Sequence, residues 1–401
     1  MLVLLLLMGA GVAGCSSNKS APNKLLLISF DGFRYDYLSK THTPNFDLLI
    51  RNGVQSEGLI PVFPSKTFPN HYSIATGLYP QHSGLIGNSM YDPVFDARYS
   101  IGNREAVEDA RWYEGEPIWN TVEKQGLKAG TMFWVGSEAP IQDMRPTYWK
   151  RYDGSVPDSA RIDTVISWFI NEDKPIDFGT LYFDFVDGAG HRFGPDSDEV
   201  VEAIRRADAL MGYLVEQLED KGLFAQTNML IVSDHGMQEI SKDRLVLLDD
   251  FIDMDDVTWV ESSPSVMLRV KQGKLNAVYN ALKEHGRHFE VWKRNELPER
   301  FGLKYHRRTP ELILSAHEGY TISSRAYVER RPGYPSGGTH GFDPVQKNMH
   351  AIFVAHGPDI ASGRTISEFE SIHLYELMCR LLGLEPSKND GKLEATNQIR
   401  P

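Results

Sequence analysis

Short apolar runs alternate with amphipathic segments along most of this chain. The apolar runs are continuous rather than alternating, a pattern typical of strands that are buried on both faces of a sheet. Each run is followed by Gly, Asp or other polar residues that favour a turn. We predict five such strands, at residues 25–30, 130–134, 180–185, 229–234 and 351–357.

Segments with helical periodicity lie between these runs, and several begin after Thr, Ser or Asp and end at Gly, as helices commonly do. We predict helices at residues 43–53, 116–126, 158–172, 197–222 and 368–384. Alternating strands and helices favour an α/β fold with a mostly parallel central sheet and helices on both faces. Residues from about 243 to 335 carry many charges and short apolar pieces. We predict that they form a smaller subdomain, inserted into or capping the main sheet.

The N-terminal residues are typical of a targeting segment. Residues 1–14 are apolar and about as long as the core of a signal peptide, and they run into a Val-Ala-Gly-Cys sequence that ends at Cys15. This sequence resembles a bacterial lipobox, in which the cysteine is lipidated, and residues 15–23 resemble the polar tether that follows it. We expect a lipid-anchored protein of the bacterial cell envelope, facing the periplasm or the exterior, with a catalytic domain at 24–401. An ordinary signal peptide with an incidental cysteine is the alternative.

Composition narrows the class of protein. The chain has 401 residues, enough for a large buried core, and a formal net charge of −12. That charge argues against a general nucleic-acid binder, but it permits a small anionic substrate where bound cations invert the local field. The only cysteine besides Cys15 is Cys379, so we expect no disulfide.

Acidic and histidine residues gather where the predicted strands end or where glycines cluster. There are six of them: Asp31, Asp187, His191, Asp234, His235 and His340. The carboxyl ends of strands form the ligand-binding edge of an open α/β sheet, so these side chains are expected to converge. Taken singly, each has a plainer interpretation as a turn or helix-capping residue.

Carboxylates and imidazoles without thiolates favour a hard-to-borderline metal. Six ligands are too many for one catalytic zinc, which keeps an open position, but they suit two metals. Two-metal sites stabilise the attacking and leaving oxygens of a displacement at phosphorus.

The stretch FPSKTFPNH, residues 63–71, holds two candidate nucleophiles, Ser65 and Thr67. Proline favours the first turn of a helix, so Pro69 predicts a helix that begins there, with Thr67 just before it. That position favours an oxyanion, although Thr67 could equally be a capping hydroxyl. Phe68 would offer a flat apolar surface at the mouth of the site.

The chain resembles the nucleotide pyrophosphatase/phosphodiesterase family of the alkaline phosphatase superfamily from about residue 24 almost to the C-terminus. The resemblance rests on DGFRYDYL, FPSKTFPNHYSIATGLYPQHSGLIGN, MYDP, GEPIWNT, DGAGHRFGP, SDHGM and GTHGFD, in this order. It implies a hydrolase of the type I phosphodiesterase kind with two zinc ions per chain.

The resemblance also implies a role for each site residue. Thr67, rather than Ser65, would be the nucleophile that takes a covalent nucleotidyl group. Asn88 would donate to the phosphoryl oxygen, and Phe68 and Tyr152 would enclose the nucleobase. One zinc would be bound by Asp31, Asp234 and His235 and contact Thr67, and the other would be bound by Asp187, His191 and His340.

Ser89 stands where nucleotide-preferring relatives can carry a charged residue, so the resemblance supports diester hydrolysis more firmly than nucleotide preference. A choline- or lipid-headgroup phosphodiesterase is one alternative. A phosphomonoesterase is another, which would need a cation such as Lys66 or Arg34 at the substrate. A non-catalytic lipoprotein that binds nucleotides or envelope components is the alternative from another class.

Overall fold

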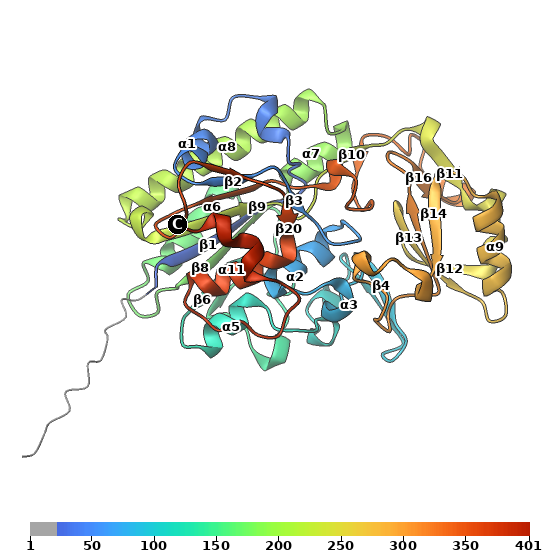
Figure 1. Ribbon diagram of the computed structural model, residues 1–401, viewed down its shortest axis with the longest axis horizontal. Helices are drawn as coiled ribbons and strands as arrows, with labels where there is room; N and C mark the ends of the chain where they lie inside the picture. Colours follow the sequence, from blue (N-terminus) through green and yellow to red (C-terminus); the bar gives the residue numbers. More distant parts are fainter. Residues whose placement is uncertain (1–21) are drawn as a thin grey trace, which may run out of the picture.

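The computed structural model describes residues 22–401, so the predicted leader and Cys15 lie outside the described residues. An eight-stranded sheet crosses the larger part of the molecule (Figure 1). In spatial order its strands are β19 (Arg364–Ile366), β2 (Val54–Ser56), β18 (Phe353–His356), β9 (Thr227–Val232), β1 (Lys24–Phe30), β8 (Phe178–Phe183), β6 (Ala129–Met132) and β7 (Tyr148–Trp149). Only β18 runs antiparallel to its neighbours, so the sheet is mostly parallel, as predicted.

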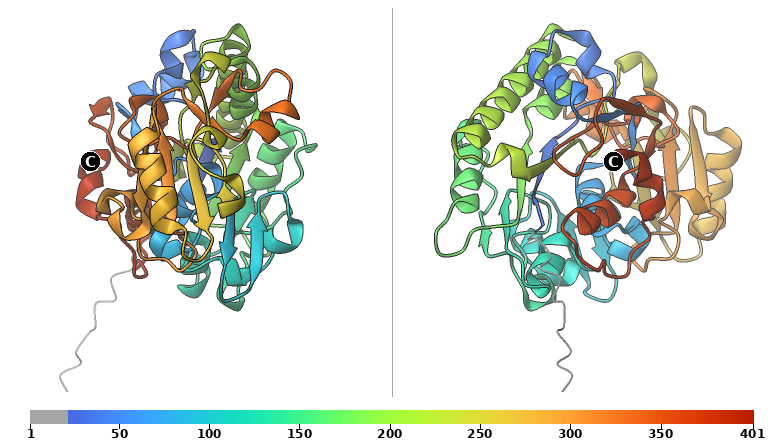
Figure 2. Two further views of the ribbon diagram at one scale, coloured as in Figure 1. Left: turned by 90° about the vertical axis from the view of Figure 1, so that its right-hand side faces the viewer. Right: turned by 60° about the vertical axis from the view of Figure 1, so that its left-hand side comes forward.

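Helices cover both faces of this sheet (Figures 1 and 2). One face packs against α1 (Pro44–Arg51), α6 (Asp158–Phe169) and α8 (Asp198–Asp220), and the other against α2 (Thr67–Thr76), α5 (Ile118–Lys124) and α11 (Leu374–Leu381). Successive side chains of a strand point to opposite faces, and Leu26 and Ile28 of β1 accordingly pack on the first set while Leu25 and Leu27 pack on the second. This two-sided burial explains the continuous apolar run, and it confirms the predicted α/β class.

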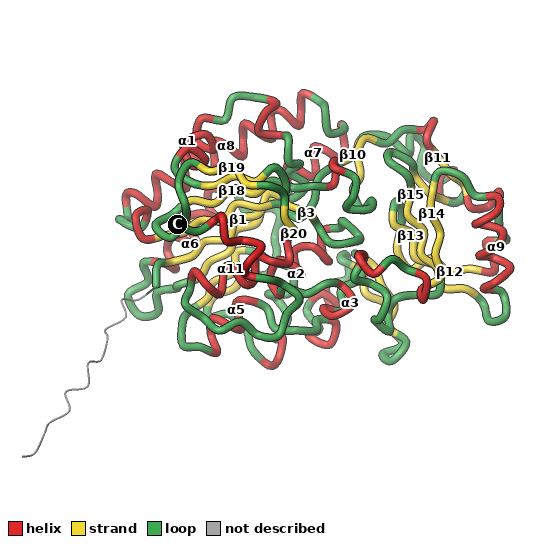
Figure 3. Tube along the Cα trace, in the orientation of Figure 1, coloured by secondary structure: helices red, strands yellow, loops and turns green. Residues whose placement is uncertain are grey.

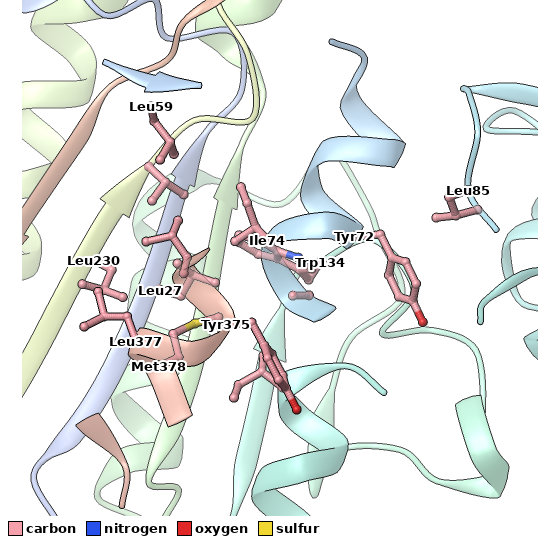
Figure 4. Packing of buried hydrophobic residues seen from close by; sticks show 14 of the residues in the cluster. Leu27, Leu59, Tyr72, Ile74, Leu85, Trp134, Leu230, Tyr375, Leu377 and Met378 are labelled. Atoms are coloured by element: carbon pink, nitrogen blue, oxygen red, sulfur yellow. The ribbon is translucent and has the colours of Figure 1, made fainter. Parts of the chain in front are cut away.

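Figure 4 shows the second of these cores. Ile74 of α2 and Leu377 and Met378 of α11 pack over Leu27 and Leu230 of the sheet. The packing fixes α2, which carries the candidate nucleophile, against the middle of the sheet.

A second sheet lies at the other end of the molecule (Figure 3). Its order is β12 (Val257–Glu261), β13 (Ser265–Val270), β15 (Leu312–Ala316) and β14 (Phe289–Lys293), with α9 (Leu275–His285) packed against it. It falls within the region that we predicted to be an inserted subdomain, although the boundaries of that subdomain stay a prediction. The parallel pair β11 (Leu245–Leu247) and β16 (Thr321–Ser323) adjoins it.

Several predicted ends were wrong. The strand predicted at 180–185 ends at Phe183, and α7 (Phe185–Phe193) begins at once. The helix predicted at 368–384 begins only at Leu374, after a short strand and a turn of 3₁₀ helix. Among the described residues, no helix is both long and apolar enough to cross a membrane.

Candidate active site

Three neighbouring strands bring the first group of side chains together. Strand β1 lies between β8 and β9 and is parallel to both, so all three end at the same edge. Asp31 follows β1, and Asp234 and His235 follow β9. These three buried residues offer ligand atoms within 4.8 Å of one another, the arrangement of a metal site. His235 Nε2 lies 2.9 Å from Asp234 Oδ2 and 3.4 Å from Asp31 Oδ1.

The second group comes from α7 and a distant loop. Asp187 and His191 lie one turn apart on α7, with His191 Nε2 3.4 Å from Asp187 Oδ2. His340 follows β17 (Gly338–Thr339), which pairs with β10 (Gln238–Glu239) just beyond the end of β9. These three residues also offer ligand atoms within 4.8 Å of one another. The two groups adjoin, because the rings of His235 and His340 stack with their centroids 3.5 Å apart.

The electrostatics of the site suit bound cations. Burial and the neighbouring charges of Asp234 and Asp187 raise the pKa of Asp31 well above its usual range. Burial also raises the pKa of Asp187, whereas at Asp234 the effect of burial is outweighed by His235 and His71, and the pKa is low. Three carboxylates this close, two of them fully buried and Asp187 half-buried, repel one another unless positive charge lies between them.

Unsatisfied oxygens support the same interpretation. Asp31 Oδ1 and Asp187 Oδ1 are buried without a hydrogen-bond partner among the described residues. Buried polar atoms are normally paired, so these two oxygens fit a site that binds cations. Burial and the nearby His235 and His191 lower the pKa of His340 well below its usual range, which keeps the imidazole neutral as metal binding requires.

Thr67 lies beside the first group. Its Oγ1 is 3.3 Å from His235 Nε2. Helix α2 begins at Thr67 itself, so the prediction that it begins at Pro69 was wrong by two residues. Thr67 is thus the first residue of the helix, where the helix dipole favours negative charge. Ser65 is buried away from this position, and its hydroxyl donates to the carbonyl of Phe342 at 2.6 Å.

A pocket of about 370 Å³ opens beside Thr67 and holds both aromatic residues named from the sequence, Phe68 and Tyr152. The Tyr152 hydroxyl donates to Asp184 at 2.5 Å. Burial and this carboxylate raise the pKa of Tyr152, so its hydroxyl stays protonated. The further lining is Asp31, Ile101, Arg104, Val107, Phe133, Trp134, Val135, Gly136, Glu138, Tyr182, Asp184, Asp187 and Gly188.

Asn88 is held by the start of α2. Its Oδ1 accepts from the backbone N–H of Phe68 at 3.0 Å. Because an N–H group can only donate, the bonded end of the amide is its oxygen. The Nδ2 end is therefore the one that can donate to a substrate.

Sequence reasoning missed several residues that support these groups. The Tyr182 hydroxyl donates to Asp31 Oδ2 at 2.6 Å, and Tyr182 comes from the middle of an apolar strand that gave no signal. His71 is fully buried between Ser29 Oγ at 2.8 Å and the carbonyl of Thr67 at 3.0 Å. His82, by contrast, lies outside the site and pairs with Asp390 at the surface.

Comparison with known proteins decides the family. Residues 25–343 match the family of type I phosphodiesterases/nucleotide pyrophosphatases. The chain belongs to this family. It is 34% identical to ectonucleotide pyrophosphatase/phosphodiesterase family member 5 of Homo sapiens, covering 98% of this chain and 81% of the relative. It is 37% identical to the bis(5′-adenosyl)-triphosphatase ENPP4 of Homo sapiens, covering 97% of this chain and 85% of that protein.

Solved structures agree with this family membership. Murine family member 5 superposes with a TM-score of 0.90 at 35% identity, and the match covers 94% of this chain and 100% of the murine chain. An inactive variant of the same murine protein, solved in complex with AMP, matches equally well, with a TM-score of 0.90. This type I phosphodiesterase/nucleotide pyrophosphatase family member is therefore a hydrolase with the fold that the resemblance implied.

Proposed function

We propose that this chain is a two-zinc phosphodiesterase that hydrolyses nucleotides and nucleotide diesters to nucleoside 5′-monophosphates through a covalent intermediate on Thr67. The observation that carries the proposal is the position of Thr67 Oγ1, 3.3 Å from His235 Nε2 and beside two groups of metal-binding type. AMP bound to an inactive relative, and the dinucleoside triphosphatase named among the relatives, support a nucleotide substrate.

The donor set fits zinc, because each group offers carboxylate oxygen and imidazole nitrogen and no thiolate. Asp31, Asp234 and His235 would hold one ion, and Asp187, His191 and His340 would hold the other. When bound, such ions lower the pKa of a nearby hydroxyl and stabilise charge on the attacking and leaving oxygens.

The reaction runs in two displacements at phosphorus. Thr67 Oγ1 gives up its proton and forms a bond to phosphorus, while the bond to the leaving group breaks and that group departs with the electron pair, opposite Thr67. A water oxygen then bonds to phosphorus as the water gives up a proton, the bond to Thr67 Oγ1 breaks, and Thr67 Oγ1 takes up a proton in its place. The positive end of α2 and the Nδ2 group of Asn88 favour the charge that develops on the oxygens.

The aromatic pocket sets the substrate class. Phe68 and Tyr152 offer apolar rings to a nucleobase, and the hydrogen bond from Tyr152 to Asp184 fixes the Tyr152 ring.

A phosphomonoesterase is disfavoured because the two cations nearest in sequence to the site residues are engaged elsewhere. Lys66 pairs with Glu261 at 3.0 Å, and Arg34 pairs with Asp36 at 2.6 Å.

A substrate panel tests the proposal. Wild type and Thr67→Ala are assayed on a nucleoside triphosphate, a dinucleoside polyphosphate, a nitrophenyl ester of thymidine 5′-monophosphate, a nitrophenyl monoester and a phosphocholine diester. We expect the wild type to hydrolyse the first three best and Thr67→Ala to be inactive on all five. Preference for the phosphocholine diester or for the monoester would replace nucleotides as the substrate class. Two zinc ions per chain without hydrolysis of any member would support a binding protein instead.

We also propose that the chain is anchored in the bacterial cell envelope by a lipid on Cys15 and faces the periplasm or the exterior, on the evidence of the lipobox-like sequence alone. Detergent phase partition of the full chain tests this. The wild type is expected in the detergent phase and Cys15→Ser in the aqueous phase. Equal partition of the two would contradict the anchor.

A further inference from the structure

A buried ion pair lies next to the proposed nucleophile and has no part in the chemistry described above. Lys66, which precedes Thr67, is 5% exposed, and Glu261, at the end of β12, is 3% exposed. Lys66 Nζ donates to Glu261 Oε1 at 3.0 Å and to the carbonyl oxygens of Ser262 at 2.9 Å and Ser263 at 3.3 Å. An ammonium group has three protons, so these acceptors engage all of them and leave none for a substrate phosphate.

Glu261 also holds the segment that carries Asn88. Its Oε2 accepts from the backbone N–H of Ser89 at 2.8 Å, and its Oε1 accepts from the N–H of Ser262 at 2.7 Å. The approach is close, because a Cβ placed on Gly87 would lie 2.6 Å from Glu261 Oε2. The carboxylate therefore bonds to the backbone after Asn88 and packs closely on the backbone before it.

Two links thus join the start of α2 to the Asn88 segment. The first runs from Lys66 through Glu261 to the backbone after Asn88, and the second is the bond from Phe68 N–H to Asn88 Oδ1 at 3.0 Å. Together they set the separation between Thr67 Oγ1 and Asn88 Nδ2, the two groups assigned to opposite tasks at one phosphoryl group.

The stem of Lys66 reaches the second metal-type group as well. A Cβ placed on Gly341 would lie 2.9 Å from Lys66 Cε, so the chain after His340 packs directly on this side chain. His340 Nδ1 in turn bonds to the carbonyl of Ser65 at 2.9 Å. Of the two residues that flank Lys66, Thr67 is therefore the proposed nucleophile, and Ser65 contacts a proposed metal ligand.

We propose that Lys66 and Glu261 are positioning residues for the phosphodiesterase reaction. The second sheet delivers Glu261 into the main domain, where the ion pair locks Thr67 and Asn88 into the geometry for attack at phosphorus. This inference rests on the proposed function. The second sheet would then contribute to catalysis by supplying Glu261. The inference also explains why the lysine next to the nucleophile is paired with a carboxylate and does not contact the substrate.

Lys66→Met and Glu261→Gln test the proposal, with Asp208→Asn as the matched control. Asp208 is also a buried carboxylate, 5% exposed, that accepts backbone N–H groups, from Asn45 at 3.0 Å and Phe46 at 2.9 Å, but it lies on α8. Because a displacement of about 1 Å can lower the rate about 100-fold, we expect kcat on the nitrophenyl nucleotide ester to fall about 10- to 100-fold in both test variants. KM and the Kd of AMP should change by less than about threefold, because the two residues are proposed to affect the chemical step and not substrate binding.

The kcat of the double variant should be no lower than that of the less active single variant, since the effects of residues that act as a unit are not additive. It also leaves no unpaired buried charge, so it serves if Lys66→Met alone does not fold. Hydrogen exchange of the peptides around residues 66–68 and 88–89 should be faster in the test variants than in the wild type. Asp208→Asn should lower the melting temperature with unchanged kcat and unchanged exchange in these peptides.

Folded variants of Lys66 and Glu261 that keep kcat within about threefold of the wild type would overturn the positioning role, because no displacement of the reacting groups would then have occurred. A similar loss of kcat in Asp208→Asn would also overturn it, since the effect would then be general destabilisation. A wild type whose hydrolysis does not depend on Thr67 would overturn the proposed function and this inference together. Thr67-dependent hydrolysis with unaffected Lys66 and Glu261 variants would overturn this inference alone.

Discussion

The two ends of the Asn88 side chain are assigned different tasks, and two substitutions separate them. Oδ1 accepts from Phe68 N–H at 3.0 Å, while Nδ2 is assigned to the phosphoryl oxygen. Asn88→Asp keeps an oxygen for the Phe68 N–H and replaces the donor end by a second carboxylate oxygen. Asn88→Ala removes both ends.

The task of each end of the amide sets the expected size of the loss in kcat and in stability. Loss of one preorganised donor to a developing oxyanion lowers kcat by about 10²- to 10³-fold, or about 2.7–4 kcal/mol of transition-state stabilisation. Asn88→Asp should lose at least this much, because its carboxylate also repels the phosphoryl oxygens. Asn88→Ala should lose a similar factor in kcat and, in addition, about 1–3 kcal/mol of stability, since the Phe68 N–H is left without its acceptor.

Two measurements read these effects separately. Turnover of the nitrophenyl nucleotide ester gives kcat, and thermal unfolding gives stability, with zinc content measured on each preparation. We expect Asn88→Asp to melt near the wild type with a much lower kcat, and Asn88→Ala to be lower in both. An Asn88→Asp variant with wild-type kcat would refute the assignment of Nδ2 to the phosphoryl oxygen.

Three further perturbations follow from the same geometry. Phe68→Ala should raise KM for nucleotides about tenfold with a smaller change in kcat, since base–aromatic stacking contributes about 1–3 kcal/mol, and an unchanged KM would exclude the base-binding role. Chelation should lower the melting temperature and added zinc should restore it, because the buried carboxylates lose their counter-charges; a melting temperature indifferent to chelation would count against a metal at this site. Burial raises the pKa of Asp92, but Arg308 and Arg307 outweigh it and lower that pKa to about 2 from 3.8. The lowered pKa stabilises the folded state above about pH 4, and this contribution is lost as the pH falls toward 2. Asp92→Asn should therefore lower the free energy of unfolding by about 2.5 kcal/mol at pH 7 and by much less near pH 2. A difference in denaturant midpoint between wild type and Asp92→Asn that is independent of pH would contradict this.

The main sheet could be predicted because its strands are buried on both faces and read as continuous apolar runs. The residues at which individual strands and helices begin and end were less predictable. Phe185 and Val186 are as apolar as the strand before them, so the single polar residue Asp184 did not reveal the change from β8 to α7. Helix α2 begins two residues before Pro69 because a proline is accepted anywhere in the first turn, where its missing N–H has no partner to lose.

The six metal-type residues could be named from their places at strand ends and in glycine-rich loops, and the structure brings them into two groups. Their supporting residues could not be named. Glu261 reaches Lys66 across 195 positions of sequence, and Tyr182 reaches Asp31 across 151, so neither contact has a local signature. The role of Lys66 depends on a partner that only the tertiary structure supplies.

The central claim is that Thr67 becomes covalently nucleotidylated, and rapid acid quench followed by peptide mass spectrometry tests it most directly. Wild-type protein mixed with the nitrophenyl nucleotide ester should show the peptide containing Thr67 heavier by one nucleoside monophosphate group during turnover. Thr67→Ala should show neither the adduct nor turnover. Near wild-type turnover by Thr67→Ala, or an adduct on another residue, would contradict the account.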